Sequence, residues 1–325
     1  MAVYTSVSDE ALAAFLEDYD LGAPQAFKGI AEGVENSNYY LETERGRFIL
    51  TLFEKRANPD DLPYFVALKQ HLADQGFACP RPVRGKDGKA LRQLAGRHAL
   101  IVTFLTGLSP KRPNAAQCRE LGRGLAQLHA AASDFSDNRV NDLGPAAWPG
   151  LWHGREHVAD TLRPGLADEI AADLIAIAEA KPQSIVLPRG TIHADLFPDN
   201  AFFIGDKFSG AIDFYFACTD ALAYDLAICI NAWAFESSGD YNYSNGANLI
   251  AGYQEVRPLE EAETAALPLL ARGAALRFFL TRLVDWTDTP ADALVRPKNP
   301  LDYASRLAFH RRARGAADYG VPGAI

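Results

Sequence analysis

The spacing of hydrophobic positions changes partway along the chain, and this change predicts its architecture. Between residues 38 and 55, β-branched and aromatic residues lie on both sides of Gly46, which predicts two strands joined by a turn. Residues 60–75 carry apolar side chains at helical spacing and predict one helix. Two further strands are expected around residues 88–94 and 98–105.

Helical spacing dominates the rest of the chain. Helices are predicted at residues 115–132, 165–180, 221–236, 259–287 and 300–314, and short strands and turns between residues 190 and 217. The pattern indicates an α+β protein with a small antiparallel-sheet N-terminal lobe and a larger, mainly helical C-terminal lobe. We expect the lobes to be residues 1–106 and 107–325, with a hinge near residues 103–109. Clefts between lobes are favoured places for ligands.

The N-terminal segment predicts a short helix, because Ser6 and Asp9 resemble a capping box and Gly22 suits a helix end. It lacks the basic and apolar regions of a secretion signal. No stretch reaches the roughly 18 uninterrupted apolar residues that a membrane helix needs, so no membrane partner is expected.

Composition and charge narrow the function. The 325 residues are 48% hydrophobic and 22% charged, which is typical of globular proteins. A net charge of −9 argues against a nucleic-acid partner, because such binding relies on clustered lysine and arginine. The four scattered cysteines lack metal-site spacing and favour free thiols in a reducing cytoplasm. The sequence gives no indication of oligomeric state.

Three polar residues between positions 193 and 213 have the spacing of a phosphoryl-transfer loop. Asp195 is followed by Asn200 five residues later and by Asp213 eighteen residues later. A carboxylate can accept a substrate hydroxyl proton, and Asn and Asp oxygens suit Mg²⁺. Taken singly, each residue is typical of a turn or a strand end. Together, they predict Asp195 as the catalytic base and Asn200 and Asp213 as metal ligands.

These residues carry a resemblance to a known superfamily. "IHADLFPDN" followed by "AIDF" resembles the aminoglycoside phosphotransferase and choline kinase superfamily, with Ala194 where glycine is usual. "LGRGLAQLHAA" and "AYDLAICINAW" match two further elements of that superfamily. The resemblance implies a protein-kinase-like fold, ATP and Mg²⁺ as cofactors, and a loop-holding role for Asp225. We expect His193 to brace the loop through hydrogen bonds.

Several segments also resemble the homoserine kinases of the threonine pathway. They are "GIAEGVENSNYYLET", "GRFILTLFEKR", "LRFFLTRLVDW" and "NPLDYASRLAFHR". This resemblance implies transfer of a phosphoryl group from ATP to the side-chain hydroxyl of L-homoserine.

The phosphate side of the site is expected in the N-terminal lobe. Gly29 and Gly33 allow a loop backbone to approach phosphates, and Asn36 lies in the same loop. The strand position where the superfamily usually has lysine holds Thr51, so Lys55, on the same side by strand alternation, is the candidate replacement. An exposed lysine at a strand end is the alternative.

The hinge is expected to bind adenine. Backbone groups of Thr103, Phe104 and Leu105 are the candidates. The Phe104 ring either packs on the base or belongs to the core.

L-homoserine presents an ammonium group, a carboxylate and a hydroxyl, and an arginine is the natural partner of a carboxylate. Arg277 and Arg282 are five residues apart on a predicted helix, so they point in different directions. The candidates for acceptor contacts are Asn38, Tyr215, Asn231, Trp233, Arg277 and Arg282.

Two other functions fit the motif. One is a kinase of the same superfamily that acts on an aminoglycoside, choline, methylthioribose or a hydroxylated amine. Cationic acceptors of this kind favour acidic or aromatic pockets. The other is a non-catalytic nucleotide-binding module, which the threonine at position 51 favours and the intact loop opposes.

Overall fold

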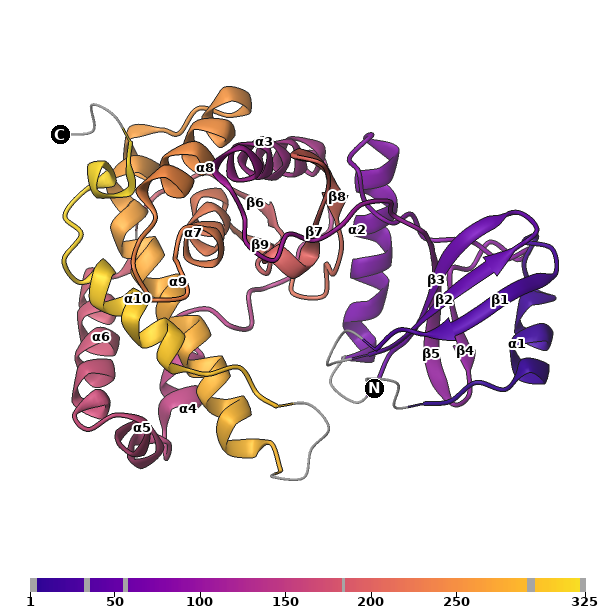
Figure 1. Cartoon of the computed structure of the whole chain (residues 1–325), viewed down its shortest axis with the longest axis horizontal. Helices are drawn as coiled ribbons and strands as arrows, with labels where there is room; N and C mark the ends of the chain where they lie inside the picture. Colours follow the sequence, from indigo (N-terminus) through magenta and orange to yellow (C-terminus); the bar gives the residue numbers. More distant parts are fainter. Residues whose placement is uncertain (1–4, 32–35, 55–57, 183–184, 291–295, 322–325) are drawn as a thin grey trace. The chain divides into compact units, whose positions relative to one another are not determined.

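The chain divides into two compact units, Met1–Thr106 and Gly107–Ile325. The computed structural model describes residues 5–31, 36–54, 58–182, 185–290 and 296–321. Figure 1 shows the N-terminal unit in indigo and violet and the C-terminal unit in magenta to yellow. Gly33 and Lys55, both predicted to contact the nucleotide, lie outside the described residues.

A five-stranded antiparallel sheet forms the N-terminal unit, in the order β1-β2-β3-β5-β4. Leucines of the sheet such as Leu41 and Leu50 are fully buried and join the core that helix α1 covers with Leu12. The elements are α1 (Asp9–Leu16), β1 (Pro24–Gly29), β2 (Ser37–Thr43), β3 (Gly46–Leu52), η1 (Pro59–Asp61), α2 (Leu62–Asp74), β4 (Leu91–Leu94) and β5 (Arg97–Thr103).

The predicted hairpin around Gly46 is confirmed, since β2 and β3 pair from Thr43–Gly46 outwards. The predicted cap of the first helix is wrong. Ser8, not Ser6, accepts a hydrogen bond from the backbone N–H of Ala11 at 3.2 Å. The helix therefore starts at Asp9, the residue after Ser8. Two serines lie within three positions, and sequence spacing alone does not decide between them.

Helices make up most of the C-terminal unit, with two small antiparallel pairs, β6-β9 and β7-β8. Its helices are α3 (Ala115–Ala131), α4 (Trp148–Trp152), α5 (Glu156–Leu162), α6 (Leu166–Ala180), α7 (Leu222–Trp233), α8 (Tyr243–Val256), α9 (Glu261–Asp288) and α10 (Leu301–His310). Its strands are β6 (Arg189–Ile192), β7 (Ala201–Ile204), β8 (Lys207–Ala211) and β9 (Cys218–Ala221), and η3 (Pro198–Asn200) and η4 (Ala316–Tyr319) are short 3₁₀ turns. The five predicted helices are present, whereas α4, α5 and α8 were not predicted.

Helices α3 and α8 pack in backbone contact. A Cβ atom on Gly122 of α3 would lie 2.0 Å from the Leu249 carbonyl oxygen, and one on Gly252 of α8 would lie 2.0 Å from the Arg119 carbonyl oxygen. Any larger residue at either position would push the helices apart. The glycines that weaken the helical signal of α8 in the sequence therefore serve its packing.

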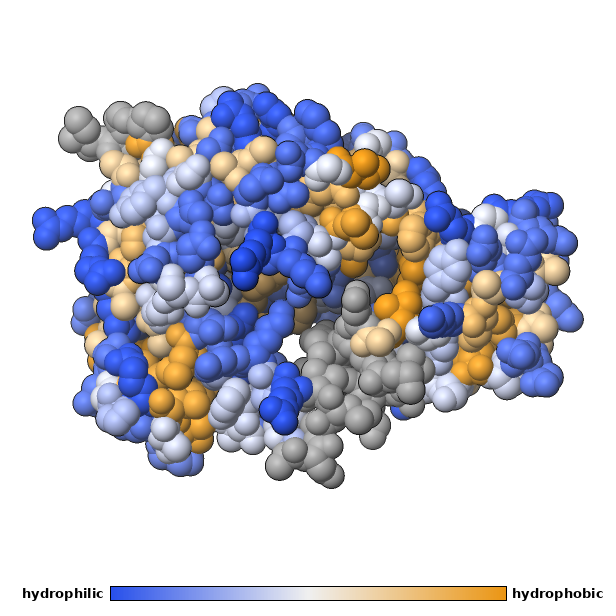
Figure 2. Space-filling model, in the orientation of Figure 1, coloured by the Kyte–Doolittle hydropathy of each residue, from blue (hydrophilic) through white to orange (hydrophobic). Residues whose placement is uncertain are grey.

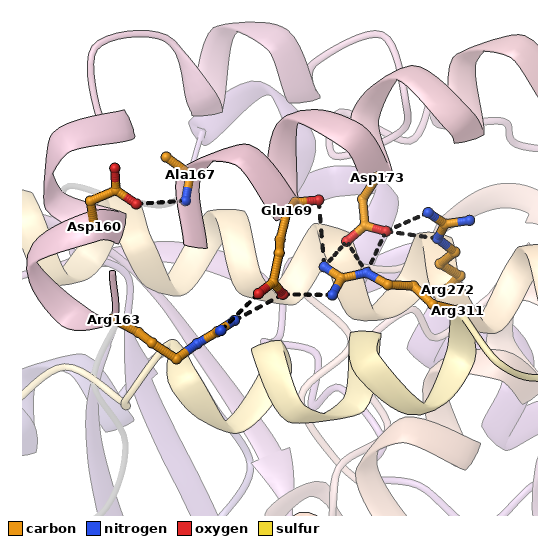
Figure 3. Close-up of polar contacts among 7 residues, drawn as sticks. All are labelled: Asp160, Arg163, Ala167, Glu169, Asp173, Arg272 and Arg311. Carbon is orange, nitrogen blue, oxygen red and sulfur yellow. Dashed lines mark hydrogen bonds and ion pairs between the residues drawn. The ribbon is translucent and has the colours of Figure 1, made fainter. Parts of the chain in front are cut away.

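Ion pairs join α6 to α9 and to Arg311, the residue that follows α10 (Figure 3). The buried Asp173 carboxylate accepts from Arg272 Nε at 2.8 Å and from Arg311 Nη2 at 2.6 Å. Glu169, one turn earlier on α6, accepts from Arg163 at 2.7 Å and from the same Arg311 at 2.6 Å. These contacts hold α9 against α6.

The visible surface is mostly hydrophilic, with a hydrophobic patch where Figure 1 labels α4 (Figure 2). A groove lined by Trp148, Trp152 and Ile177 lies on α4 and α6. Among the described residues, no helix is long and apolar enough to cross a membrane.

We predict that Asp173→Ala lowers the free energy of unfolding by about 3–5 kcal/mol, because it leaves two arginines beside a buried site without their shared carboxylate. Urea denaturation measures this. Asp168→Ala on the exposed side of α6 is the control, with an expected loss of about 1 kcal/mol or less. Equal losses in the two variants would contradict the prediction.

Candidate active site

The site is built on the loop that follows β6. Ala194 and Asp213 both have positive φ angles, 62° and 63°, which place them in the left-handed region. This conformation costs an L-residue about 1–2 kcal/mol, whereas glycine adopts it freely. The φ angle explains why glycine is usual at position 194, and it requires surrounding contacts that hold the loop in place.

One buried carboxylate holds the backbone of the loop. Asp225 on α7 is fully buried and accepts from the N–H of His193 at 2.7 Å and from the N–H of Ala194 at 2.9 Å. Burial alone would raise the pKa of Asp225, but hydrogen bonds from His129 and His193 outweigh it and hold the pKa below its usual value. Asp225 therefore stays ionised, and its contacts with the two N–H groups favour the loop-holding role predicted for it.

His193 spans the loop from inside. Its Nε2 donates to the Ile212 carbonyl oxygen at 2.9 Å, and its Nδ1 accepts from the Asp195 N–H at 3.3 Å. Burial lowers the pKa of His193, against the opposing charge of Asp225, so the imidazole is neutral and these two roles are compatible. The hydrogen bonds agree with the bracing role predicted for His193.

The three motif residues are linked through Asn200. Its Nδ2 donates to the Asp195 carbonyl oxygen at 2.8 Å and to Asp195 Oδ2 at 3.1 Å. The Asn200 carbonyl oxygen accepts from the Ile212 N–H at 2.9 Å, which places Asp213 next in the chain. Asp195 and Asn200 are half-buried and Asp213 is exposed. The amide nitrogen is occupied by Asp195, so Oδ1 is the atom of Asn200 that a cation would bind.

The donor set fits a hard cation only in part. No group of three or more His, Cys, Asp or Glu residues that could hold a metal exists among the described residues. Asn200 and Asp213 offer an amide and a carboxylate oxygen. This suits Mg²⁺, which is usually bound by one or two carboxylates together with substrate phosphates and water.

Buried donors hold the loop from the carbonyl side. Arg277 Nη1 donates to the Ala194 carbonyl oxygen at 2.6 Å, and Trp233 Nε1 donates to the Leu196 carbonyl oxygen at 2.8 Å. Both side chains are 2% exposed. For Trp233 these contacts favour a loop-supporting role over the acceptor contact expected from the sequence.

A hydrogen-bonded chain extends from Asp225 to the start of α9. His129 Nε2 donates to Asp225 at 3.1 Å and its Nδ1 accepts from the Tyr253 hydroxyl at 2.8 Å. Tyr253 accepts from Arg257 at 3.2 Å, and Arg257 binds both oxygens of the buried Glu263 at 3.0 Å. Sequence reasoning missed these partners, although the Leu-His pair that ends α3 marks His129.

The remaining candidates for acceptor contacts have different surroundings. Asn231 is fully buried, where its amide donates to two backbone carbonyls and accepts from His310, which favours a structural role. Arg282 donates to Asp302 at 2.8 Å, and its Cζ atom lies 4.6 Å from the centre of the Tyr303 ring. Tyr215 is half-buried beside Asp213, and Asn38 belongs to the N-terminal unit.

On the nucleotide side, the segment after Gly29 connects β1 to β2. Asn36 Oδ1 accepts from the Glu54 N–H at 3.3 Å, and Thr51 donates to Asn38 at 2.8 Å across the β2–β3 pair. Thr51 thus has a structural contact within the sheet. The nucleotide contacts of Gly29 and Asn36 stay predictions.

In the expected hinge, the N–H of Thr103 donates to the backbone carbonyl oxygen of Arg81. The N–H of Phe104 donates to the backbone carbonyl oxygen of Arg47. A backbone donor to adenine would therefore come from Leu105. The Phe104 ring packs edge-on against Tyr40 at 5.9 Å.

Comparison with known proteins agrees with the geometry. A model of the phosphotransferase enzyme family matches residues 26–259. Among solved structures, an amicoumacin kinase aligns with a TM-score of 0.66 at 14% identity, covering 94% of this chain and 92% of its own. An aminoglycoside phosphotransferase from Alicyclobacillus acidocaldarius aligns with a TM-score of 0.66 at 18% identity, covering 94% and 93%. The fold is that of the protein-kinase-like phosphotransferases, as the sequence predicted.

Sequence relatives narrow the class. A homoserine kinase from Hyphomonas neptunium is 64% identical over 99% of this chain and 100% of its own. One from Xanthobacter autotrophicus is 58% identical over 99% of both chains. The chain belongs to the homoserine kinase family within the phosphotransferase enzyme family.

We predict that Tyr253→Phe lowers the free energy of unfolding by about 1–3 kcal/mol, because the buried Nδ1 of His129 loses its donor. Urea denaturation measures the change. Tyr243→Phe, on the same helix but 58% exposed, is the matched control and should be nearly neutral. A Tyr253→Phe variant as stable as this control would refute a role for the chain of hydrogen bonds.

Proposed function

We propose that the protein transfers the γ-phosphoryl group of ATP to the side-chain hydroxyl of L-homoserine, giving ADP and O-phospho-L-homoserine for threonine biosynthesis. The supporting observation is the braced loop in which Asn200 bonds to Asp195 and to Ile212, the residue before Asp213, in a chain that is 64% identical to a homoserine kinase over 99% of its length. The four free cysteines are compatible with a reducing cytoplasm as its location.

Asp195 is the catalytic base in this proposal. The bond from Asn200 Nδ2 to Asp195 Oδ2 fixes the rotation of the carboxylate, which accepts the hydroxyl proton. The hydroxyl oxygen then forms a bond to the γ-phosphorus as the bond between phosphorus and the ADP oxygen breaks. Catalysis of this kind depends on positioning, which the hydrogen bonds around the loop supply.

Asn200 and Asp213 are the proposed ligands of Mg²⁺. When bound, Mg²⁺ neutralises the charge that develops on the phosphate oxygens. Asn200 offers Oδ1 because its nitrogen is used by Asp195, and Asp213 offers an exposed carboxylate. In the N-terminal unit, we propose that the segment from Gly29 to Asn38 and Lys55 contact the phosphates and that the hinge contacts adenine.

The test is a coupled ADP-release assay with homoserine, serine, threonine, choline and an aminoglycoside as acceptors. Homoserine should give the highest kcat/KM. Serine should be poor, because its chain is one methylene shorter and its hydroxyl does not reach the donor phosphate. Turnover of another acceptor without homoserine would indicate a different small-molecule kinase. ATP binding without transfer to any acceptor would indicate a non-catalytic module.

Asp195→Asn should lower kcat by about 10²–10⁴-fold, because the amide cannot accept the hydroxyl proton. ATP binding, measured by calorimetry, should change little. Asp199→Asn is the matched control: its side chain is 78% exposed on the same loop, and kcat should stay within about twofold. Similar loss of kcat in both variants would refute the assignment of Asp195.

A further inference from the structure

Arg277 is a buried cation for which the described residues supply no carboxylate. It is 2% exposed, and its charge is met by the Ala194 carbonyl oxygen and by the Phe278 ring, 4.3 Å from its Cζ atom. Its Nε atom is buried without a hydrogen-bond partner among the described residues. The two other arginines of α9 each have a carboxylate partner: Arg272 pairs with Asp173, and Arg282 pairs with Asp302.

A second arginine near this position has no acidic partner in the part of the chain that the structure describes. Arg306 on α10 lies with its Cζ atom 4.2 Å from the centre of the Tyr303 ring, and its Nη1 atom is buried without a hydrogen-bond partner in the part of the chain that is described. Burying cationic groups without an anion is costly, so the buried Arg277 and the buried Nη1 atom of Arg306 in one region favour the binding of an anion there. Arg306 is half-buried and connects the region with the surface.

Two tyrosine hydroxyls complete the cluster. The hydroxyl of Tyr303 is buried and makes no hydrogen bond to the described residues, and the hydroxyl of Tyr224 is buried where Arg277 acts on it. The Tyr303 ring stacks on Phe278 at 5.4 Å, the same ring that Arg277 covers. Burial raises the pKa of Tyr303, and the charges acting on it include Arg306, Arg282, Asp195 and Arg277.

The cluster therefore lies beside the catalytic loop. Arg277 binds the carbonyl oxygen of Ala194, the residue that precedes Asp195. An acceptor whose hydroxyl is at Asp195 would have the rest of its chain within reach of this cluster.

We propose that Arg277, Arg306 and Tyr303 bind the carboxylate of the acceptor and so select an amino acid over a simple amino alcohol. The inference rests on the proposed function and names the part of the substrate that this side of the site recognises. Guanidinium N–H and phenol O–H groups are donors that match a carboxylate. The same arginines would repel choline or an aminoglycoside, which are cations.

The test compares two acceptors, L-homoserine and 3-amino-1-propanol, which has the same hydroxyl chain and ammonium group without the carboxylate. The wild type should prefer homoserine by about 100-fold or more in kcat/KM. Arg306→Met should lower kcat/KM for homoserine by about 100-fold, mainly through KM, and leave that for 3-amino-1-propanol within about threefold. Tyr303→Phe should lower kcat/KM for homoserine by about tenfold. Because this substitution is conservative, it still tests the inference if the Arg306→Met variant does not fold.

Arg312→Met, an exposed arginine on the segment after α10, is the control and should leave both values unchanged. A wild type that uses both acceptors equally would overturn the inference, as would variants that lose activity equally on both. Failure of the wild type to phosphorylate homoserine would instead refute the proposed function itself.

Discussion

The structure of the loop that follows β6 and carries Asp195 depends on one buried carboxylate. Asp225 uses both of its oxygens: Oδ1 accepts from Ala194 N–H, and Oδ2 accepts from His193 N–H and His129 Nε2. All of its neighbours in these contacts are donors, so a neutral amide in its place would direct N–H against N–H. Its position in the first turn of α7 further favours a negative charge through the helix dipole.

The loop is held from both sides by groups of opposite character. The anion Asp225 binds its backbone N–H groups, and the donors Arg277 and Trp233 bind its carbonyl oxygens. These contacts offset the backbone strain at Ala194 and fix the position of the backbone at Asp195. Because the supports come from helices packed in the core, the loop that carries the proposed catalytic residues stands on rigid elements, which would suit catalysis by positioning.

The sequence indicated the parts of the candidate site that depend on short spacing. Asp195, Asn200 and Asp213 lie within a few turns of one another, so their spacing alone indicated a loop that can bring them together. The supports were harder to find, because His129 and Tyr253 are 96 and 124 residues from their partners, and no local pattern encodes such pairs.

Errors in the predictions have physical causes. Helix α8 was missed because Gly246 and Gly252 weaken its signal, yet Gly252 permits backbone contact with α3. Asn231 stays a candidate acceptor contact, although its burial and its hydrogen bonds favour a structural role. Helix α7 is buried almost all round, so a polar residue there pairs inside the core, and sequence periodicity cannot show its direction.

Amide hydrogen exchange on an Asp225→Asn variant tests the central claim most directly. The account predicts that the N–H groups of His193 and Ala194 exchange at least about tenfold faster than in the wild type, since each loses a charged acceptor. Amides in the middle of α9 should keep their protection, which shows that the variant is folded. Unchanged protection of the two loop amides in a folded variant would contradict the claim that Asp225 holds the loop.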